Sequence, residues 1–215
     1  MSGPPKIDRM RILSLLLSLF FVACNSGDGS TAEEPDQVDP YSYPSTDGDA
    51  LNVVIEIPAG GNHKIEYRPG IGYVNDTLTD GSERVVRFLP YPGNYGFVPS
   101  TLMDRSKGGD GDALDVLVIG ETVPTGTKMR ALPIGALMLR DRGEIDTKIV
   151  AIPANPAERT LDVENFLDFS LGNDAAKRII ETWFLNYKGP GMVELLRWED
   201  EAYAWREVRK WQTDN

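Results

Sequence analysis

Three aspartates lie within six positions of the string GGDGDALDVLVIG, residues 108–120. Carboxylates this close repel one another, and the pKa of each is raised unless a positive charge lies among them. A solvated acidic turn is one interpretation. Two details favour a metal site instead. Asp115 lies inside an apolar run, and the two-residue period of a strand places the side chains of Asp110 and Asp112 on the same side of the chain. Hard carboxylate oxygens suit Mg²⁺ or Mn²⁺, so the spacing predicts a divalent-cation site.

A second acidic cluster follows in the string LRDRGEIDTKIVAIP, where Asp141, Glu144, Asp146 and Lys148 surround a turn at Gly143. A hairpin tip with mixed charges is usually just solvated, so this cluster gains meaning only if the fold brings it against the first. Basic and tyrosine side chains are also suggestively placed, although each alone fits ordinary packing or a helix end. They are Lys64, Arg84, Arg87, Tyr91, Tyr95, Tyr187 and Lys188.

Several classes of function are excluded. The formal net charge is −11, so no basic surface is expected to follow a nucleic-acid backbone, and nucleic acid is not an expected partner. An acidic chain can still bind an anion if it binds metal ions first. An EF-hand is ruled out because Leu114 and Asp115 stand where its loop needs Asp or Asn followed by Gly. No Gly-x-x-x-x-Gly-Lys-Ser/Thr string is present, which argues against an NTPase.

The first 50 residues read as targeting sequence and linker. Lys6, Arg9 and Arg11 precede an apolar run over residues 12–23, which has the length of an export signal and is short for a spanning helix. The string FVAC ends at the chain's single cysteine, Cys24, and resembles the lipobox of bacterial lipoproteins, although Phe stands where Leu is usual. An ordinary signal peptide with an unrelated cysteine is the alternative.

Three regions are therefore predicted. Residues 1–23 form a signal peptide of the lipoprotein type, and residues 24–50 a lipidated cysteine followed by a flexible Gly, Ser, Pro and acid-rich linker. Residues 51–215 form one folded domain, which fits a chain of 215 residues. The expected location is the bacterial cell envelope, periplasmic or outer surface, with membrane attachment through the lipid.

The elements that position the charged residues are strands first and helices afterwards. Six β-branched or alternating segments are punctuated by Gly and Pro: LNVVIEIPA, HKIEYR, VVRFLPYP, ALDVLVIG, KMRALPIGALML and DTKIVAIPA. Helical spacing appears over residues 163–188 and 200–212. The order favours an α+β fold, most simply an antiparallel barrel flanked by two C-terminal helices. A sandwich with a helical appendage would give a similar pattern.

Six segments in order resemble the family I soluble inorganic pyrophosphatases: VVIEIPAG, HKIEY, YPGNYGFVPSTL, DGDALDVLV, D-(x)₄-DTKIVAIP and a helix ending in NYK. The resemblance spans residues 51–212, and DGDxxDVLV is its most diagnostic string. It implies a five-stranded OB-like antiparallel β-barrel with helices. It also implies Mg²⁺-dependent hydrolysis of pyrophosphate to two phosphates by a metal-activated water, with Mn²⁺ or another divalent ion as a possible substitute, and a possible homo-oligomer.

The resemblance also assigns roles to individual residues. Asp110, Asp115 and Asp146 would bind the activating metal ions, and Asp141 and Glu56 would serve ions that arrive with substrate. Asp112 would be the general base beside the attacking water, and Tyr95 and Lys148 would act with it in catalysis. The remaining positions that hold phosphate or line the cavity are Lys64, Glu66, Arg84, Tyr91, Tyr187 and Lys188.

Two departures from the family pattern stand out. The phosphate-binding arginine usually lies eight residues before the YP tyrosine, but Arg84 lies seven before Tyr91, which leaves Arg87 as an alternative. Arg142 replaces a usual glutamate and is expected to alter the charge around the later metal ions. The only histidine, His63, excludes the histidine-rich manganese type of pyrophosphatase. Two rival functions stay open: an inactive OB-type binding module, and a metal-dependent phosphatase acting on larger phosphorylated compounds.

Overall fold

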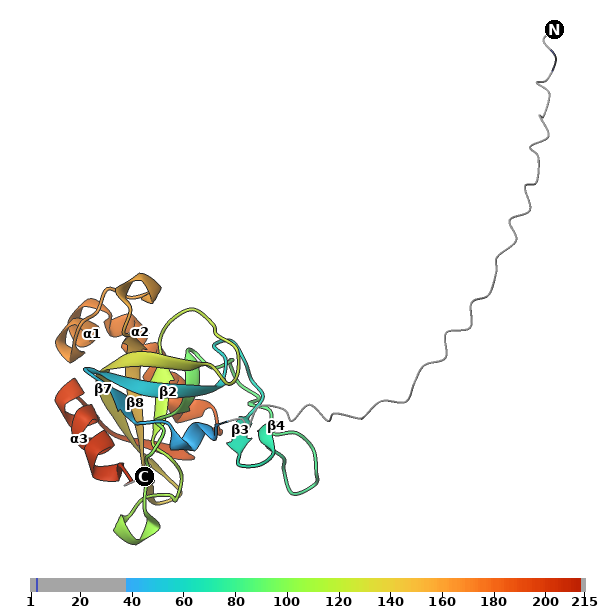
Figure 1. The fold of residues 1–215 in the computed structure, drawn as a ribbon, viewed down its shortest axis with the longest axis horizontal. Helices are drawn as coiled ribbons and strands as arrows, with labels where there is room; N and C mark the ends of the chain where they lie inside the picture. The colour runs from blue at the N-terminus through green and yellow to red at the C-terminus, as the bar shows by residue number, and fades with distance from the viewer. Residues whose placement is uncertain (1–2, 4–37, 214–215) are drawn as a thin grey trace, which may run out of the picture. The chain divides into compact units, whose positions relative to one another are not determined.

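Five strands form a closed barrel in the computed structural model, which describes Gly3 and residues 38–213 (Figure 1). Strand β7 pairs back onto β2, with Leu51 opposite Ala131, and this contact closes the ring. The predicted α+β barrel is confirmed. In order around the barrel, the strands are β2 (Ala50–Ile57), β5 (Asn94–Phe97), β6 (Asp115–Val118), β8 (Glu144–Pro153) and β7 (Lys128–Asp141).

One neighbouring pair in the barrel is parallel, whereas the sequence predicted antiparallel pairing throughout. Strands β6 and β8 run in the same direction, with Val116 opposite Ile149, and the other four contacts of the ring are antiparallel. The reason is geometric, because a closed ring with an odd number of strands cannot alternate direction at every step. The parallel pair carries one acid of the first cluster, Asp115, and Asp146 of the second, so this exception to the prediction shapes the candidate site.

Short strands and helices surround the barrel. Strands β1 (Thr46–Asp47) and β9 (Val193–Glu199) extend the sheet, and β3 (Ile65–Arg68) and β4 (Gly72–Asn75) form a separate hairpin. The 3₁₀ turns are η1 (Pro40–Ser42), η2 (Arg105–Lys107) and η3 (Pro156–Glu158). The α-helices are α1 (Phe166–Gly172), α2 (Asp174–Asn186) and α3 (Glu201–Trp211).

The first predicted helix, residues 163–188, is two helices in the structure. It is interrupted at Asn173, whose backbone has φ −127° and ψ 29° and is not helical. Asn165 caps α1, because its side chain accepts a hydrogen bond from the Asp168 N–H, and asparagine is favoured at such caps. The second predicted helix is confirmed as α3, where Asp200 caps the first turn through the Tyr203 N–H.

The barrel strands are buried on both faces, and two apolar clusters hold the helices against them. On β8, Val150 and Ile152 belong to the cluster that packs α1 and α2, whereas Ile149 and Ala151 belong to the cluster that packs α3. This division follows from the two-residue period of a strand. Burial on opposite faces therefore holds β8, and the acidic residues at its start, in a fixed orientation.

The last part of the predicted linker is folded, which corrects the boundary at residue 50. From residue 38 the chain packs on the domain: the Ser100 N–H donates to the Tyr41 carbonyl over 3.0 Å, and the Ser100 hydroxyl donates to the Tyr43 carbonyl over 2.7 Å. Ser45 is buried, and its hydroxyl accepts from the Gln212 amide over 2.9 Å. The polar composition of this segment did not predict that it packs on the domain, because its contacts are made by backbone groups and aromatic rings.

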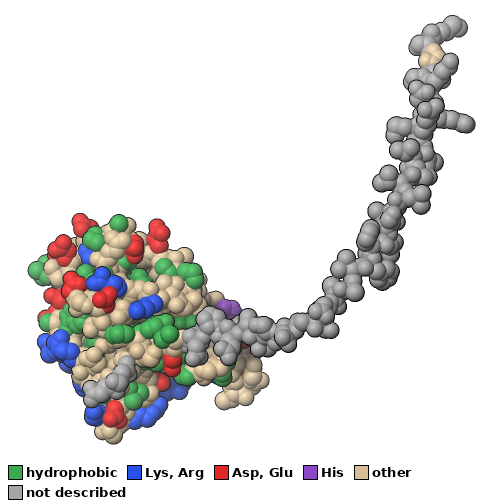
Figure 2. Space-filling model, viewed as in Figure 1, with side chains coloured by type: hydrophobic (Ala, Val, Ile, Leu, Met, Phe, Trp, Pro, Cys, Tyr) green, Lys and Arg blue, Asp and Glu red, His purple; other side chains and the backbone are tan. Residues whose placement is uncertain are grey.

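Apart from Gly3, the predicted signal peptide lies outside the described residues, and so does the lipidation site Cys24. Between residues 38 and 213 no helix has the length and apolar character to span a bilayer. Basic and acidic side chains are interspersed with hydrophobic ones over the face of the domain in Figure 2.

Candidate active site

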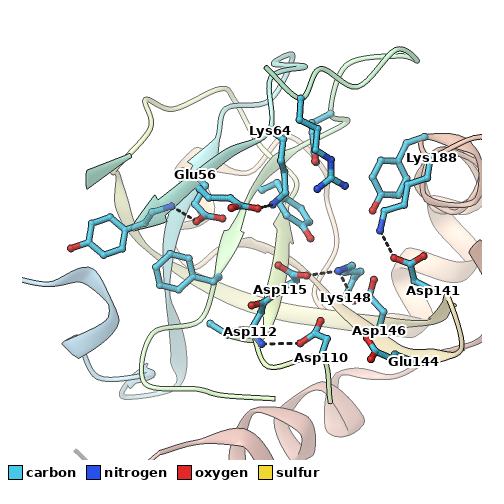
Figure 3. A pocket seen from close by; sticks show the side chains of 18 of the residues that line it. Glu56, Lys64, Asp110, Asp112, Asp115, Asp141, Glu144, Asp146, Lys148 and Lys188 are labelled. Atoms are coloured by element: carbon cyan, nitrogen blue, oxygen red, sulfur yellow. Dashed lines mark hydrogen bonds and ion pairs between the residues drawn. The ribbon is translucent and has the colours of Figure 1, made fainter. Parts of the chain in front are cut away.

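A single cavity of about 430 Å³ brings together every site residue that the sequence predicted within the domain. Its walls come from the barrel strands, from the β3 hairpin, from the loop before β6 and from the end of α2. Figure 3 shows the acidic groups and the lysines facing one another across this space. The predicted residues that line it are Glu56, Lys64, Glu66, Arg84, Tyr91, Tyr95, Asp110, Asp112, Asp115, Asp141, Asp146, Lys148, Tyr187 and Lys188.

The parallel pair of strands positions the centre of the cavity. Asp115 begins β6, and Asp146 and Lys148 stand two positions apart on β8, so their side chains leave the same face of that strand. The Lys148 ammonium contacts carboxylate oxygens of both Asp115 and Asp146. Burial alone would lower the pKa of Lys148, but these two carboxylates outweigh it and raise the pKa well above its usual value. Lys148 therefore stays charged although it is only 4% exposed.

Two aspartates of the cavity have raised pKa values. Burial raises the pKa of Asp146, against the opposing effect of Lys148, and burial together with Asp110 and Asp115 raises the pKa of Asp112. Among the described residues, the buried Oδ1 oxygen of Asp141 lacks a hydrogen-bond donor, whereas Oδ1 of Asp146 contacts the Lys148 ammonium. An unsatisfied buried carboxylate oxygen in an acidic cavity suits a divalent cation.

The ligand set is not already arranged around a metal ion. Within the described residues, no three His, Cys, Asp or Glu side chains are grouped closely enough to hold one. The Lys148 ammonium lies between Asp115 and Asp146, where it supplies the positive charge that these carboxylates need. For both carboxylates to ligate one ion, this side chain has to move. The donor types fit a divalent cation, and the side-chain arrangement would adjust on binding.

Glu56 forms the opposite acidic wall of the cavity. Its carboxylate accepts a hydrogen bond from the Tyr67 backbone N–H over 2.7 Å, and its side chain is held between β2 and β3. Burial raises the pKa of Glu56 to about 7, although Lys64 and the Tyr67 N–H favour the charged form. Glu56 therefore changes its charge close to neutral pH.

This raised pKa makes a testable prediction for stability. A carboxyl that binds its proton more tightly in the folded state stabilises the fold below pH 4.5 and loses that stabilisation as pH rises through about 7. Glu56→Gln removes this dependence, so in metal-free buffer the variant should gain stability over the wild type between these pH values. We expect a gain of up to about 3 kcal/mol at pH 8. Urea unfolding from pH 4 to pH 8 measures it, and parallel curves for the two proteins would contradict the prediction.

The phosphate-binding candidates lie around the rest of the cavity. The Lys64 ammonium lies 3.4 Å from a carboxylate oxygen of Glu66, and the Arg84 guanidinium lies 3.2 Å from a carboxylate oxygen of Asp76. The Lys188 ammonium contacts the carboxylate of Asp141. Each of these cations is thus held in place by a carboxylate while it faces the cavity. Arg-carboxylate and Lys-carboxylate pairs of this kind leave donors free for an anion.

Three tyrosines complete the basic side, and a tryptophan positions two of them. Trp183 stacks on Tyr187 at 4.6 Å between ring centres and lies 4.5 Å from Tyr91. Its indole N–H donates to the Leu89 carbonyl over 2.8 Å, which fixes its orientation. Burial raises the pKa of Tyr91, Tyr95 and Tyr187, so each hydroxyl stays protonated and can donate a hydrogen bond to phosphate.

The structure separates the two arginines that the sequence left as alternatives. Arg84 lines both the main cavity and an adjoining cavity of about 300 Å³, whereas Arg87 lines only the adjoining one. Arg142 lines that adjoining cavity too, at the tip of the β7–β8 hairpin. Its φ of 51° and the φ of 93° at Gly143 form a two-residue turn that matches the strand twist. The geometry thus places Arg84, and not Arg87 or Arg142, among the predicted metal ligands and phosphate contacts.

Six further residues line the cavity that sequence reasoning did not assign. Glu144 belongs to the second acidic cluster, so the sequence already indicated that its position could be functional. In the structure its carboxylate lies 3.9 Å from the Arg105 guanidinium. Nothing in the sequence indicated a functional role for Tyr41, because it lies in a segment with the composition of a linker. The six are Tyr41, Tyr67, Phe97, Arg105, Ala113 and Glu144.

Comparison with known proteins agrees with this arrangement. The model of the inorganic pyrophosphatase family matches residues 53–215. The inorganic pyrophosphatase of Agrobacterium fabrum (strain C58) is 36% identical over 177 residues, which cover 78% of this chain and 91% of that protein. The enzyme of Aquifex pyrophilus is 39% identical over 168 residues, with 74% of this chain and 86% of that protein covered.

Solved structures show the same likeness. An inorganic pyrophosphatase from Coxiella burnetii superposes with a TM-score of 0.66 at 32% identity, covering 79% of this chain and 97% of that one. The inorganic pyrophosphatase from Thermus thermophilus gives a TM-score of 0.66 at 30% identity, covering 79% and 94%. The matching region contains every predicted site residue of the domain. This chain therefore belongs to the inorganic pyrophosphatase family.

Proposed function

We propose that this protein hydrolyses inorganic pyrophosphate to two phosphates with Mg²⁺ as its cofactor, which Mn²⁺ or another divalent ion can replace. One observation carries the proposal: acids from β6, β7, β8 and the loop before β6 converge with lysines, an arginine and tyrosines in one cavity. A site of this composition can hold cations and a small polyanion together. Membership of the pyrophosphatase family supports the choice of substrate.

The acidic wall would hold the cations. Asp110, Asp115 and Asp146 would bind the first ions, and Asp141 and Glu56 would complete the set with substrate present. Bound divalent cations neutralise phosphate charge and lower the pKa of water, which is the chemistry that this reaction needs. The unpartnered Oδ1 oxygen of Asp141 is available for this purpose, and Oδ1 of Asp146 becomes available when Lys148 moves.

Asp112 is the base that this cavity offers. Its carboxylate lies in the loop before β6, and its N–H donates to Asp110 over 3.0 Å, which fixes the turn. Because burial and its acidic neighbours raise its pKa, the Asp112 carboxylate is a stronger base than an ordinary aspartate. It would accept the proton of the water that attacks phosphorus.

The basic wall would bind the substrate and stabilise the leaving phosphate. Pyrophosphate oxygens repel an incoming nucleophile, so the site must neutralise them before attack. Lys64, Arg84 and Lys188 provide fixed positive charge, and the neutral tyrosine hydroxyls donate hydrogen bonds. Lys148 and Tyr95 lie between the acidic and basic walls, 5.8 Å apart from ammonium to ring centre, where charge develops during cleavage.

Phosphate release by the purified protein tests the proposal. With Mg²⁺, pyrophosphate should give two phosphates per molecule, and a chelator in excess of the metal should abolish the reaction until Mg²⁺ is restored. Inorganic triphosphate and a sugar phosphate serve as competing substrates. No release from pyrophosphate at saturating Mg²⁺ would support the inactive binding module, and faster release from a sugar phosphate would support the broader phosphatase.

We further propose that the protein is exported and held at a membrane of the bacterial envelope by a lipid on Cys24. The basic residues ahead of the apolar run at 12–23 and the FVAC string support this proposal. A lipoprotein anchor has at least two acyl chains, which is enough for stable attachment.

Cys24→Ser is expected to release the protein into the soluble fraction, because the acyl chains have no other attachment site. Fractionation of cells that produce the variant, followed by immunoblotting, measures the shift. Ser26→Ala, two residues further on, should stay with the membrane and serves as the control. If Cys24→Ser also stays with the membrane, the lipid is not the anchor.

A further inference from the structure

A segment ahead of the family's domain forms part of the catalytic cavity. The family match begins at residue 53, but the chain is folded on the domain from residue 38. Besides the two Ser100 contacts, the Asn52 amide donates to the Pro44 carbonyl over 2.9 Å. Backbone and side-chain hydrogen bonds thus hold this docked segment, residues 38–49, against β2 and the loop that follows β5.

The docked segment delivers one aromatic side chain to the cavity. The ring of Tyr41 lies 4.5 Å from that of Phe97 and 5.4 Å from that of Tyr67, measured between ring centres, and all three line the cavity. Tyr43, two residues later, packs instead under the Lys128 ammonium at 4.5 Å and does not line it. The two tyrosines of this segment therefore contact different parts of the protein.

The two residues on which the Tyr41 ring packs are each next to one acid of the cavity. Tyr67 donates its backbone N–H to Glu56, and Phe97 lies opposite Asp115 in the β5–β6 register. Burial, and then the nearby Glu56 and Asp112, raise the pKa of Tyr41, so its hydroxyl stays neutral beside these acids. A neutral aromatic ring in this place excludes water without adding charge.

We propose that Tyr41 is a positioning residue of this active site, whose ring packs on Tyr67 and Phe97 and thereby fixes the segments that hold the metal-binding acids Glu56 and Asp115. The inference rests on the proposed function, because it assigns Tyr41 a role in that same site. The ring carries the effect and the hydroxyl does not, since the contacts in the structure are ring contacts. The relevant effect is a fixed position for the backbone around these two acids, which limits how far their carboxylates must move to bind a cation.

The test uses the full-length protein with Tyr41→Ala, Tyr41→Phe and the matched control Tyr43→Ala. Tyr41→Ala should lower kcat for magnesium pyrophosphate about tenfold, a fraction of what misplaced catalytic groups can cost. KM for pyrophosphate should stay within about twofold, because the cations on the basic wall are untouched. Tyr41→Phe should restore kcat, and Tyr43→Ala should keep it.

A second readout needs no catalysis. Calorimetric titration of Mn²⁺ into the substrate-free proteins should show weaker binding for Tyr41→Ala than for the wild type, Tyr41→Phe or Tyr43→Ala. Circular dichroism confirms that each variant is folded. Wild-type kcat and Mn²⁺ affinity in Tyr41→Ala would overturn the inference, as would equal losses in Tyr41→Ala and Tyr43→Ala or a failure of Tyr41→Phe to restore function. A wild-type protein that releases no phosphate would instead overturn the proposed function itself.

Discussion

Asp112→Asn is expected to lower kcat for pyrophosphate hydrolysis by about 10²- to 10⁴-fold, the range that removal of a general base produces. The amide keeps the size of the side chain and cannot accept the proton of the attacking water at neutral pH. KM should change little, because this substitution leaves the cations that bind pyrophosphate unchanged. Removing one of several crowded negative charges should leave the fold at least as stable.

Initial rates with saturating Mg²⁺ across pH measure this effect and separate it from a loss of metal binding. Asp162→Asn makes the same change of charge at an exposed position outside the cavity and should leave kcat unchanged. A loss that added Mg²⁺ reverses would reassign Asp112 as a metal ligand. A variant as active as the wild type would remove it from the mechanism.

Lys148→Met should be the most destabilising single change in the cavity. Methionine preserves much of the side-chain volume but leaves Asp115 and Asp146 facing each other without the ammonium between them. Removal of one partner from a buried ion pair costs about 3–5 kcal/mol, and kcat should fall as well because a cation beside the leaving phosphate is lost.

The sign of the pH dependence follows from the same charges. Lys148 opposes the burial that raises the pKa of Asp146, so loss of the ammonium raises this pKa further in the folded state and the variant should recover stability as pH falls. Mg²⁺ should also restore stability, because the ion supplies the missing positive charge and binds only the folded state. Urea unfolding with and without Mg²⁺ measures both effects.

Lys188→Met is the matched control for Lys148→Met. Its ammonium pairs with one carboxylate, Asp141, and its side chain is 20% exposed against 5% for Lys148. Solvent screens this pair better, so its loss should cost less stability. If the two variants lose the same stability, the position of Lys148 between two carboxylates has no special energetic effect.

The sequence predicted four of the five barrel strands, because their signal is local, but it missed β5. It was wrong about the segment VVRFLPYP, residues 85–92, where the structure has no strand and only an isolated bridge between Val85 and His63. Residues such as Ile149 to Ile152 are apolar in an unbroken run, as expected for a strand buried on both faces. It failed on β9, where Val193–Glu199 alternates poorly and carries Glu194 and Arg197 on a partly exposed edge. A strand whose partner is a distant segment, here β7, leaves little trace in its own composition.

The candidate site shows the same division between local and distant information. The crowding of Asp110, Asp112 and Asp115 is visible in the sequence and points to a cation without any alignment. The placement of Lys148 between two acids cannot be seen in the sequence, because it depends on the parallel pairing of β6 with β8. Tyr41 was missed for a related reason, since a single ring in a polar segment becomes part of a site only through its docking.

The two ends of the domain meet on one loop. Ser100 accepts the Thr213 N–H over 2.9 Å and also binds the Tyr41 carbonyl, and Gln212 reaches Ser45. The polypeptide would therefore tolerate circular permutation, with a short linker joining residue 213 to residue 38 and new termini at the exposed turn around Asp80 and Gly81. The same neighbourhood means that an affinity tag fused after residue 213 would emerge beside the segment that leads back to the N-terminus, and could crowd Tyr41.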